Sequence, residues 1–284
     1  GAHLWADRFD GALEDVFELQ DKITGSVVGA IEPTLRKVEI ERARRRPAEN
    51  LDAYDLYLRA LPHVYAFRPD ENLIGLELLR KAVALDPNYA PALAYAAWCL
   101  EQRLVRGSPP TSPDDRDQAI ALARRAIAAG GGDAMALVAA GFVMVMVARD
   151  YDAGLDAVRR ALELNPGAGF VAMLSSAAMV FGGSPQDALA QAERAMALSP
   201  LDPGLHLYLT LAGFAHLLSG RPDQALEWAK RSAAIYADWD TTYWVLVPAY
   251  AQLGQLQEAR AALAKLATLS TGLTVSVVRQ RLPF

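Results

Sequence analysis

Hydrophobic and small residues recur along this chain in one seven-residue phrase. The phrase is clearest at residues 160–166, where it reads Arg-Ala-Leu-Glu-Leu-Asn-Pro, and it returns at residues 81–87 and 194–200. Weaker copies begin at three further basic positions, Arg125, Arg231 and Lys265. The copies follow one another at intervals of roughly 34 residues, a period typical of repeated helix pairs. The pattern therefore predicts stacked helices that form one elongated domain.

A small residue stands six positions before the basic anchor of every copy, where it would let two helix backbones approach closely. These small residues are Gly75, Ala119, Gly154, Ala188, Ala225 and Ala259. The preceding helices carry small residues as well, at Ala97, Gly141, Ser176 and Gly213. We interpret these two sets as the points where the helices of a pair cross.

The end of the phrase predicts a contact and a helix stop. Four residues after the anchor stands a leucine that we expect to fill the space between layers, at Leu85, Leu164, Leu198 and Leu269. In three copies a proline follows and biases its predecessor out of the α region. The helices concerned should therefore end at Asp86, Asn165 and Ser199.

This pattern resembles the tetratricopeptide repeat (TPR) over residues 50–271. The resemblance implies an all-α, TPR-type αα solenoid, a right-handed superhelix of about six helix pairs. A Pro-rich stretch at residues 105–113 should protrude as a loop, because it cannot be helical. We expect residues 272–284 to form a C-terminal tail or capping helix.

The residues before the repeats predict two further segments. Residues 1–11 read as a short strand, and because one strand cannot satisfy its own edges, we interpret it as the remnant of a preceding α/β domain. Its open edge predicts disorder or a homodimer formed through this strand. Residues 12–49 should form a helical linker that is kinked at Pro33.

Composition limits the binding partners and the cellular location that we expect for this chain. The net charge of −5 gives no support for nucleic-acid binding. The apolar run Ala134–Ala148 is shorter than the about 20 residues that a membrane span needs, so we expect a core helix and no membrane contact. Cys99 is the single cysteine, which excludes an intrachain disulfide and agrees with a cytoplasmic location.

The sequence offers no set of residues for catalysis. None of the four histidines has a second metal ligand at helical spacing, and Cys99 lacks an evident base. Acidic residues at helix starts, Asp238 and Asp240 among them, are interpreted as helix caps. We therefore expect no catalytic, cofactor-binding or metal-binding residue, and a stand-alone enzyme is the least favoured function.

Three segments point to a particular context for the repeats: residues 1–10 (GAHLWADRFD), 19–21 (LQD) and 50–55 (NLDAYD). With the TPRs that follow, they resemble the C-terminal region of bacterial multidomain class III adenylate or guanylate cyclases. In that family the opening phrase closes an α/β domain similar to the N-terminal domain of TolB. The resemblance implies a non-catalytic protein–protein interaction and regulatory module, because the cyclase residues belong to a domain not present here. Similar tails follow winged-helix domains in transcription regulators, so an effector-sensing region of such a regulator is the alternative.

The TPR pattern also predicts a binding face. The first helix of each TPR pair lines a concave groove, and the small residues place seven aromatic and Met side chains there: Trp98, Phe142, Met146, Phe170, Met173, Phe214 and Trp244. None of the chain's lysines falls among these positions, which excludes the Lys-based clamp for a peptide carboxylate. An apolar peptide, an amphipathic helix or the parent's own upstream domains would suit such a groove. The alternative is that these side chains are interhelical core.

Overall fold

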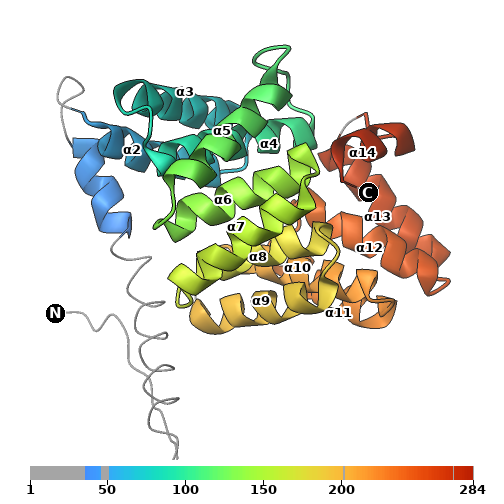
Figure 1. The fold of residues 1–284 in the computed structure, drawn as a ribbon. Coiled ribbons are helices and arrows are strands. Elements are labelled where there is room, and N and C mark those ends of the chain that lie inside the picture. Colours follow the sequence, from blue (N-terminus) through green and yellow to red (C-terminus); the bar gives the residue numbers. More distant parts are fainter. Residues whose placement is uncertain (1–35, 46–50, 201, 271, 284) are drawn as a thin grey trace, which may run out of the picture.

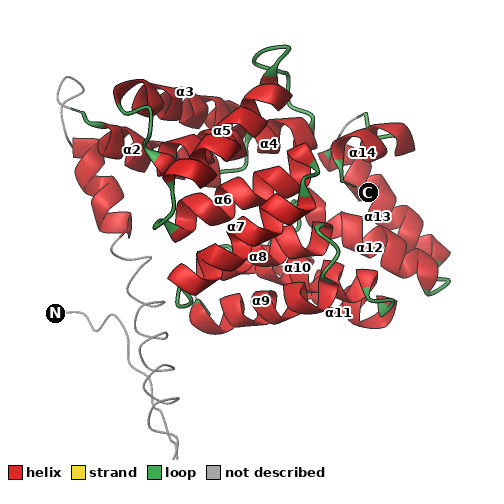
Figure 2. Ribbon diagram, in the orientation of Figure 1, coloured by secondary structure: helices red, strands yellow, loops and turns green. Residues whose placement is uncertain are grey.

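The computed structural model describes residues 36–45, 51–200, 202–270 and 272–283. Within these ranges the chain forms helices joined by short loops and no strand (Figure 2). The expected all-α, TPR-like solenoid is confirmed. The strand expected at residues 1–11 and the kink expected at Pro33 lie outside the described residues.

The helices follow one another in pairs that stack side by side (Figure 1). The pairs are α2 (Ala53–Tyr65) with α3 (Pro69–Leu85), α4 (Ala90–Arg106) with α5 (Asp115–Ala129), α6 (Ala134–Val143) with α7 (Tyr151–Leu164), α8 (Gly169–Phe181) with α9 (Pro185–Leu198), α10 (Leu205–Leu218) with α11 (Pro222–Ile235), and α12 (Asp240–Gln252) with α13 (Leu256–Leu269). A short helix, α14 (Val275–Arg281), follows the last pair.

Local chemistry fixes where many of these helices begin and end. Asp52 and Asp133 cap α2 and α6, since their carboxylates accept hydrogen bonds from the backbone N–H of Asp55 (2.8 Å) and Ala136 (2.9 Å). The helices α3, α9 and α11 each begin with a proline, which needs no N–H partner at that position. The predicted helix stops are confirmed to within one residue. The last helical residues of α3, α7 and α9 are Leu85, Leu164 and Leu198, and the C-cap residues that follow are Asp86, Asn165 and Ser199.

Small residues allow the two helices of a pair to touch backbone to backbone. A Cβ added to Gly141 would lie 2.7 Å from the carbonyl oxygen of Gly154, and a Cβ on Gly154 would lie 2.8 Å from that of Gly141. In the next pair the hydroxyl of Ser176 donates to the carbonyl of Ala188 at 2.7 Å. The sequence prediction of close crossings is therefore confirmed at these pairs.

The leucines four residues after the anchors do not all fill the space between layers. Leu85 is 60% exposed and Leu164 is 47% exposed. Each is the last residue of its helix, and the buried contact is made one turn earlier, by Ala82 and Ala161. The prediction for these two leucines was wrong because it extended the packed face to the helix end.

The apolar run after Asp133 forms α6 and then one π-helical turn, Met144–Ala148. The turn ends at Arg149, which adopts a left-handed conformation (φ 57°). Nearly the whole run is buried. Among the described residues, no helix is both long enough and apolar enough to cross a membrane.

The curvature of the stack returns its C-terminal end to its beginning. Figure 1 shows α14 beside the end of α4, and these two helices are in contact. The start of α12 also reaches α4, through an ion pair between Arg106 and Asp240. The first helices of the pairs therefore surround a central space that the C-terminal segment, residues 272–283, helps to close.

Candidate functional site

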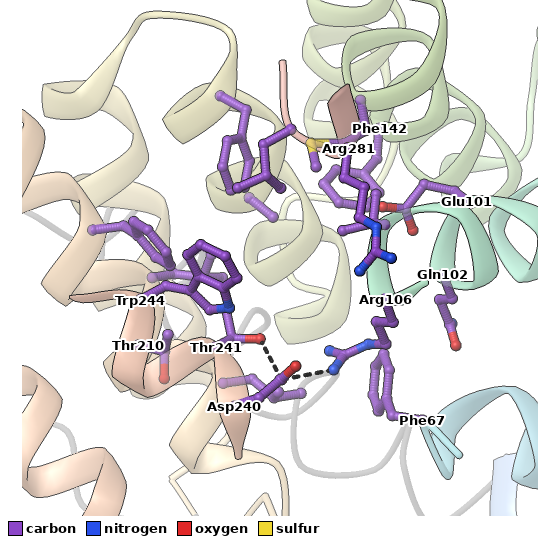
Figure 3. Close-up of a pocket in the computed structure, with 18 of the residues that line it drawn as sticks. Phe67, Glu101, Gln102, Arg106, Phe142, Thr210, Asp240, Thr241, Trp244 and Arg281 are labelled. Atoms are coloured by element: carbon purple, nitrogen blue, oxygen red, sulfur yellow. Dashed lines mark hydrogen bonds and ion pairs between the residues drawn. The ribbon is translucent and has the colours of Figure 1, made fainter. Parts of the chain in front are cut away.

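A cavity of about 160 Å³ occupies this central space. Its walls come from α4, α6 with its π turn, α8, α10 and α12, together with the turn before α3 and the C-terminal segment (Figure 3). Aromatic and aliphatic side chains dominate the lining.

Six of the seven residues predicted for the groove line this cavity: Trp98, Phe142, Met146, Met173, Phe214 and Trp244. The first five of these are at most 8% exposed, and Trp244 is half-buried. The seventh, Phe170, packs edge-on against Trp98 with ring centroids 5.8 Å apart. The sequence thus identified side chains that share one space, and their role in partner binding stays a prediction.

The C-terminal segment closes the cavity, which sequence reasoning did not anticipate. Leu273, Val278 and Leu282 contribute apolar lining. The guanidinium of Arg149 donates to the carbonyls of Arg279 (3.2 Å) and Leu282 (3.1 Å). Arg149 ends the π turn with a left-handed backbone conformation. The same residue therefore ends the turn and holds the C-terminal segment in place.

An ion pair crosses the mouth of the cavity. Arg106 Nη1 donates to Asp240 Oδ1 at 2.7 Å, and its guanidinium lies 4.3 Å from the ring centroid of Trp239. Burial alone would raise the pKa of Asp240, but Arg106 and a hydrogen bond from Ser270 (2.9 Å) hold that pKa below its usual value. Asp240 is therefore a partner of Arg106 across the ring, and the interpretation of Asp240 as a helix cap was wrong, because its side chain makes no cap hydrogen bond.

Glu101 is the most unusual polar residue of the lining. It is 4% exposed, and among the described residues it has neither a hydrogen bond nor an ion pair. Burial raises the pKa of its carboxyl to about 8, although the charge of Arg106 opposes this shift. The neighbouring Gln102 is by contrast satisfied, since it accepts from Asn72 Nδ2 at 3.2 Å and donates to the carbonyl of Val64 at 3.4 Å.

A sequence signal for Glu101 was available. Residues 101–103 (Glu-Gln-Arg) interrupt a helix that is otherwise almost entirely apolar from residue 90 onward. Charged residues are rarely buried without a partner, so a glutamate in the middle of a core helix indicates either a hidden ion pair or a site. Within the described residues Glu101 has no ion-pair partner, which makes it a candidate site residue.

The described residues contain no group of three or more His, Cys, Asp or Glu side chains placed to hold a metal ion. Cys99 follows Trp98 in α4 and is fully buried. Burial raises the pKa of its thiol well above the ordinary value. A neutral, enclosed thiol is a poor nucleophile.

The fold and this cavity define the chain as a TPR-like αα solenoid. No known protein-family profile matches it. The crystal structure of the APC/C hetero-tetramer Cut9-Hcn1 superposes with a TM-score of 0.58 at 14% identity, over 94% of this chain and 49% of that one. YrrB, described as a TPR protein with an unusual peptide-binding site, superposes with a TM-score of 0.42 at 19% identity, over 71% of this chain and 95% of its own. At 14% identity the likeness to the Cut9-Hcn1 structure shows the fold alone.

A curated relative supplies the context. A stretch of 133 residues is 32% identical to "Putative adenylate cyclase 3" of Rhizobium meliloti (strain 1021). This match covers 47% of this chain and 23% of that protein. The matched part thus spans less than a quarter of the length of the relative. Together with the solenoid, the match confirms the resemblance to the TPR region of a cyclase-containing protein.

Proposed function

We propose that this chain is a non-catalytic interaction and regulatory module of a bacterial signalling protein, an adenylate or guanylate cyclase. The observation that carries the proposal is the match of 133 residues at 32% identity to a protein named as an adenylate cyclase. The solenoid supports it, because stacked helix pairs offer extended surfaces for neighbouring domains or partner proteins. A cyclase is favoured over a winged-helix transcription regulator on the strength of that match.

The predicted groove residues are the proposed contact surface for an apolar segment of a partner or of the parent's own upstream domains. In the closed arrangement the C-terminal segment lies over the space that Trp98, Phe142 and Phe214 line. A protein segment would therefore bind only when residues 272–283 withdraw. This makes the C-terminal segment the natural point of control.

The proposal is tested on the full product of the gene. Cyclic AMP and cyclic GMP formation from ATP and GTP are measured for that product and for a version that ends before the repeats. We expect cyclase activity in both and a changed rate or a lost response to cellular extract in the shortened version. Identical rates and responses would contradict a regulatory role, and nucleotide turnover by this chain alone would contradict a non-catalytic one.

A further inference from the structure

We propose that the central cavity is a binding site for a small organic amine, whose protonated amino group pairs with Glu101 and whose apolar body packs against the aromatic wall. This inference goes beyond the interaction module and does not depend on which enzyme is attached. It rests on the size of the cavity, on the unpaired carboxyl that faces it and on the nature of its lining.

The size of the cavity sets the size of the ligand. Its volume is about 160 Å³. Buried apolar cavities of about 150 Å³ take up a molecule of the size of benzene. A single ring or a short branched alkyl group with one amino group would therefore fill the space, whereas a peptide helix would not.

Several other polar groups around the cavity already have partners. Arg106 pairs with Asp240, whose second oxygen accepts from Ser270. The hydroxyl of Thr210 lies 2.9 Å from those of Ser232 and Thr242. The indole N–H of Trp239 is also buried without a hydrogen-bond partner, but it is a donor and cannot accept from an ammonium group. The carboxyl of Glu101 is therefore the acceptor that a ligand amine would complete.

Arg281 is the second cation of the lining. It is half-exposed, and its guanidinium lies against Gly107, so a Cβ at that glycine would collide with it. Arg106, and not Arg281, is the cation whose charge acts on Glu101.

The character of the lining favours a cation over an anion. The faces of aromatic rings carry partial negative charge and attract ammonium groups. Trp98 lines the same cavity as Glu101. Phe142 and Trp244 line it as well (Figure 3). A ligand carboxylate would instead place a second acid beside Glu101, with Arg106 already neutralised by Asp240.

Binding of an amine is coupled to a proton. In the empty cavity Glu101 keeps its proton at neutral pH, because its pKa is about 8. An ammonium group stabilises the ionised carboxyl, so each binding event releases a proton and the affinity rises with pH up to that value. The other charged groups that face the cavity are Asp240, whose pKa lies below its usual value, and the guanidinium groups of Arg106 and Arg281.

The test uses the whole chain and three probes of nearly the same shape: benzylamine, benzyl alcohol and benzoate. Affinities are measured by calorimetry on the wild type, on Glu101→Gln and on Glu163→Gln, a control whose glutamate is exposed on α7. We expect the wild type and the control to bind benzylamine at least about tenfold more tightly than benzyl alcohol. Glu101→Gln should lose this preference and still bind the alcohol.

Several outcomes would overturn the inference: no binding of benzylamine by the wild type, equal affinity for amine and alcohol, or tighter binding of benzoate. If Glu101→Gln does not fold, the wild type alone decides the matter, because its affinity for benzylamine must rise between about pH 6 and pH 8 with proton release. A pH-independent affinity would refute the pairing with Glu101. None of these results bears on cyclase regulation, so the two proposals fail separately.

Discussion

Arg106 at the end of α4 and Asp240 at the start of α12 are 134 residues apart in sequence, and their side chains form an ion pair of 2.7 Å. The pair joins the second helix pair of the solenoid to the sixth and so closes the ring around the cavity. Phe67, with a left-handed backbone (φ 51°), stacks edge-on against Trp239 beside it, with centroids 5.3 Å apart. A non-glycine residue in this conformation is held by its surroundings, which here are the contacts that close the ring.

Replacing Arg106 by Met should destabilise the chain by about 2 kcal/mol, because the carboxylate of Asp240 would lose its charged partner in a largely buried place. The matched control is Arg68→Met, whose pair with Asp70 is exposed on both sides. That control should leave the free energy of unfolding close to that of the wild type, because solvent screens an exposed ion pair. Urea denaturation measures both, and equal effects would contradict a structural role for the closing pair.

The same pair predicts an acid response. The folded-state pKa of Asp240 is below its ordinary value, so its contribution to stability is complete above about pH 4 and is lost as the pH falls through the folded value. Wild type should therefore lose more stability than Arg106→Met when the pH is lowered from about 5 to about 2. Parallel pH profiles of the two proteins, measured by thermal unfolding, would count against this assignment.

Gly141→Ala should destabilise the chain by about 1–3 kcal/mol, because the new methyl group would meet the carbonyl oxygen of Gly154 at 2.7 Å and the backbones of α6 and α7 would have to separate. Gly132→Ala is the control, since nothing lies within 4 Å of a Cβ there. Its midpoint in chemical denaturation should stay close to that of the wild type. A tolerated Gly141→Ala would contradict a backbone contact between α6 and α7 at this crossing.

Whether the sequence predicts a given contact depends on how far apart the two residues lie along the chain. The repeat period predicted the helix pairs, and the small residues Gly141 and Gly154 predicted where α6 and α7 cross, because both signals lie within one or two repeats. The closing contacts join residues more than a hundred positions apart, as Arg149 and Leu282 do, and no periodic pattern encodes them.

The candidate site shows the same division. Trp98, Phe142 and Trp244 were identified because their positions follow from the repeat, and they do line one space. What covers them was missed, because the C-terminal segment lies outside the period. Glu101 was overlooked although its place among apolar residues of α4 marks it in the sequence.

Single alanine substitutions test whether the predicted groove residues are buried in the walls of the cavity or face an open groove. Trp98 is 3% exposed and Phe142 8% exposed, so each should cost about 3–5 kcal/mol when truncated to alanine. Trp244 is half-buried and should cost less. Chemical denaturation of the three variants measures this order, and uniformly small losses would indicate that these rings face an open groove.

Removing residues 272–284 should open the cavity. Leu273, Val278 and Leu282 would no longer cover the aromatic lining, so binding of the dye ANS and quenching of tryptophan fluorescence by acrylamide should both increase. Val275→Ser is the control, because Val275 is 71% exposed and its side chain faces solvent. Unchanged dye binding in the shortened chain would mean that the segment does not protect the cavity.

Glu101→Gln should stabilise the empty protein, and the gain should depend on pH. The pKa of Glu101 is about 8 in the folded chain and about 4.3 in an unfolded one. Between these values the folded state holds a proton that the unfolded state has released, so the wild type becomes less stable as the pH rises, and the loss levels off above the folded value.

Glutamine keeps the shape of the neutral acid, and because it does not ionise, its stability does not fall with pH in this way. The difference in thermal midpoint between Glu101→Gln and the wild type should therefore grow from about pH 5 to about pH 8 and then stay constant. Glu163→Gln, on an exposed face, should show no such growth. A difference that is flat across this range would place the carboxyl of Glu101 in contact with water and would remove the reason for its raised pKa.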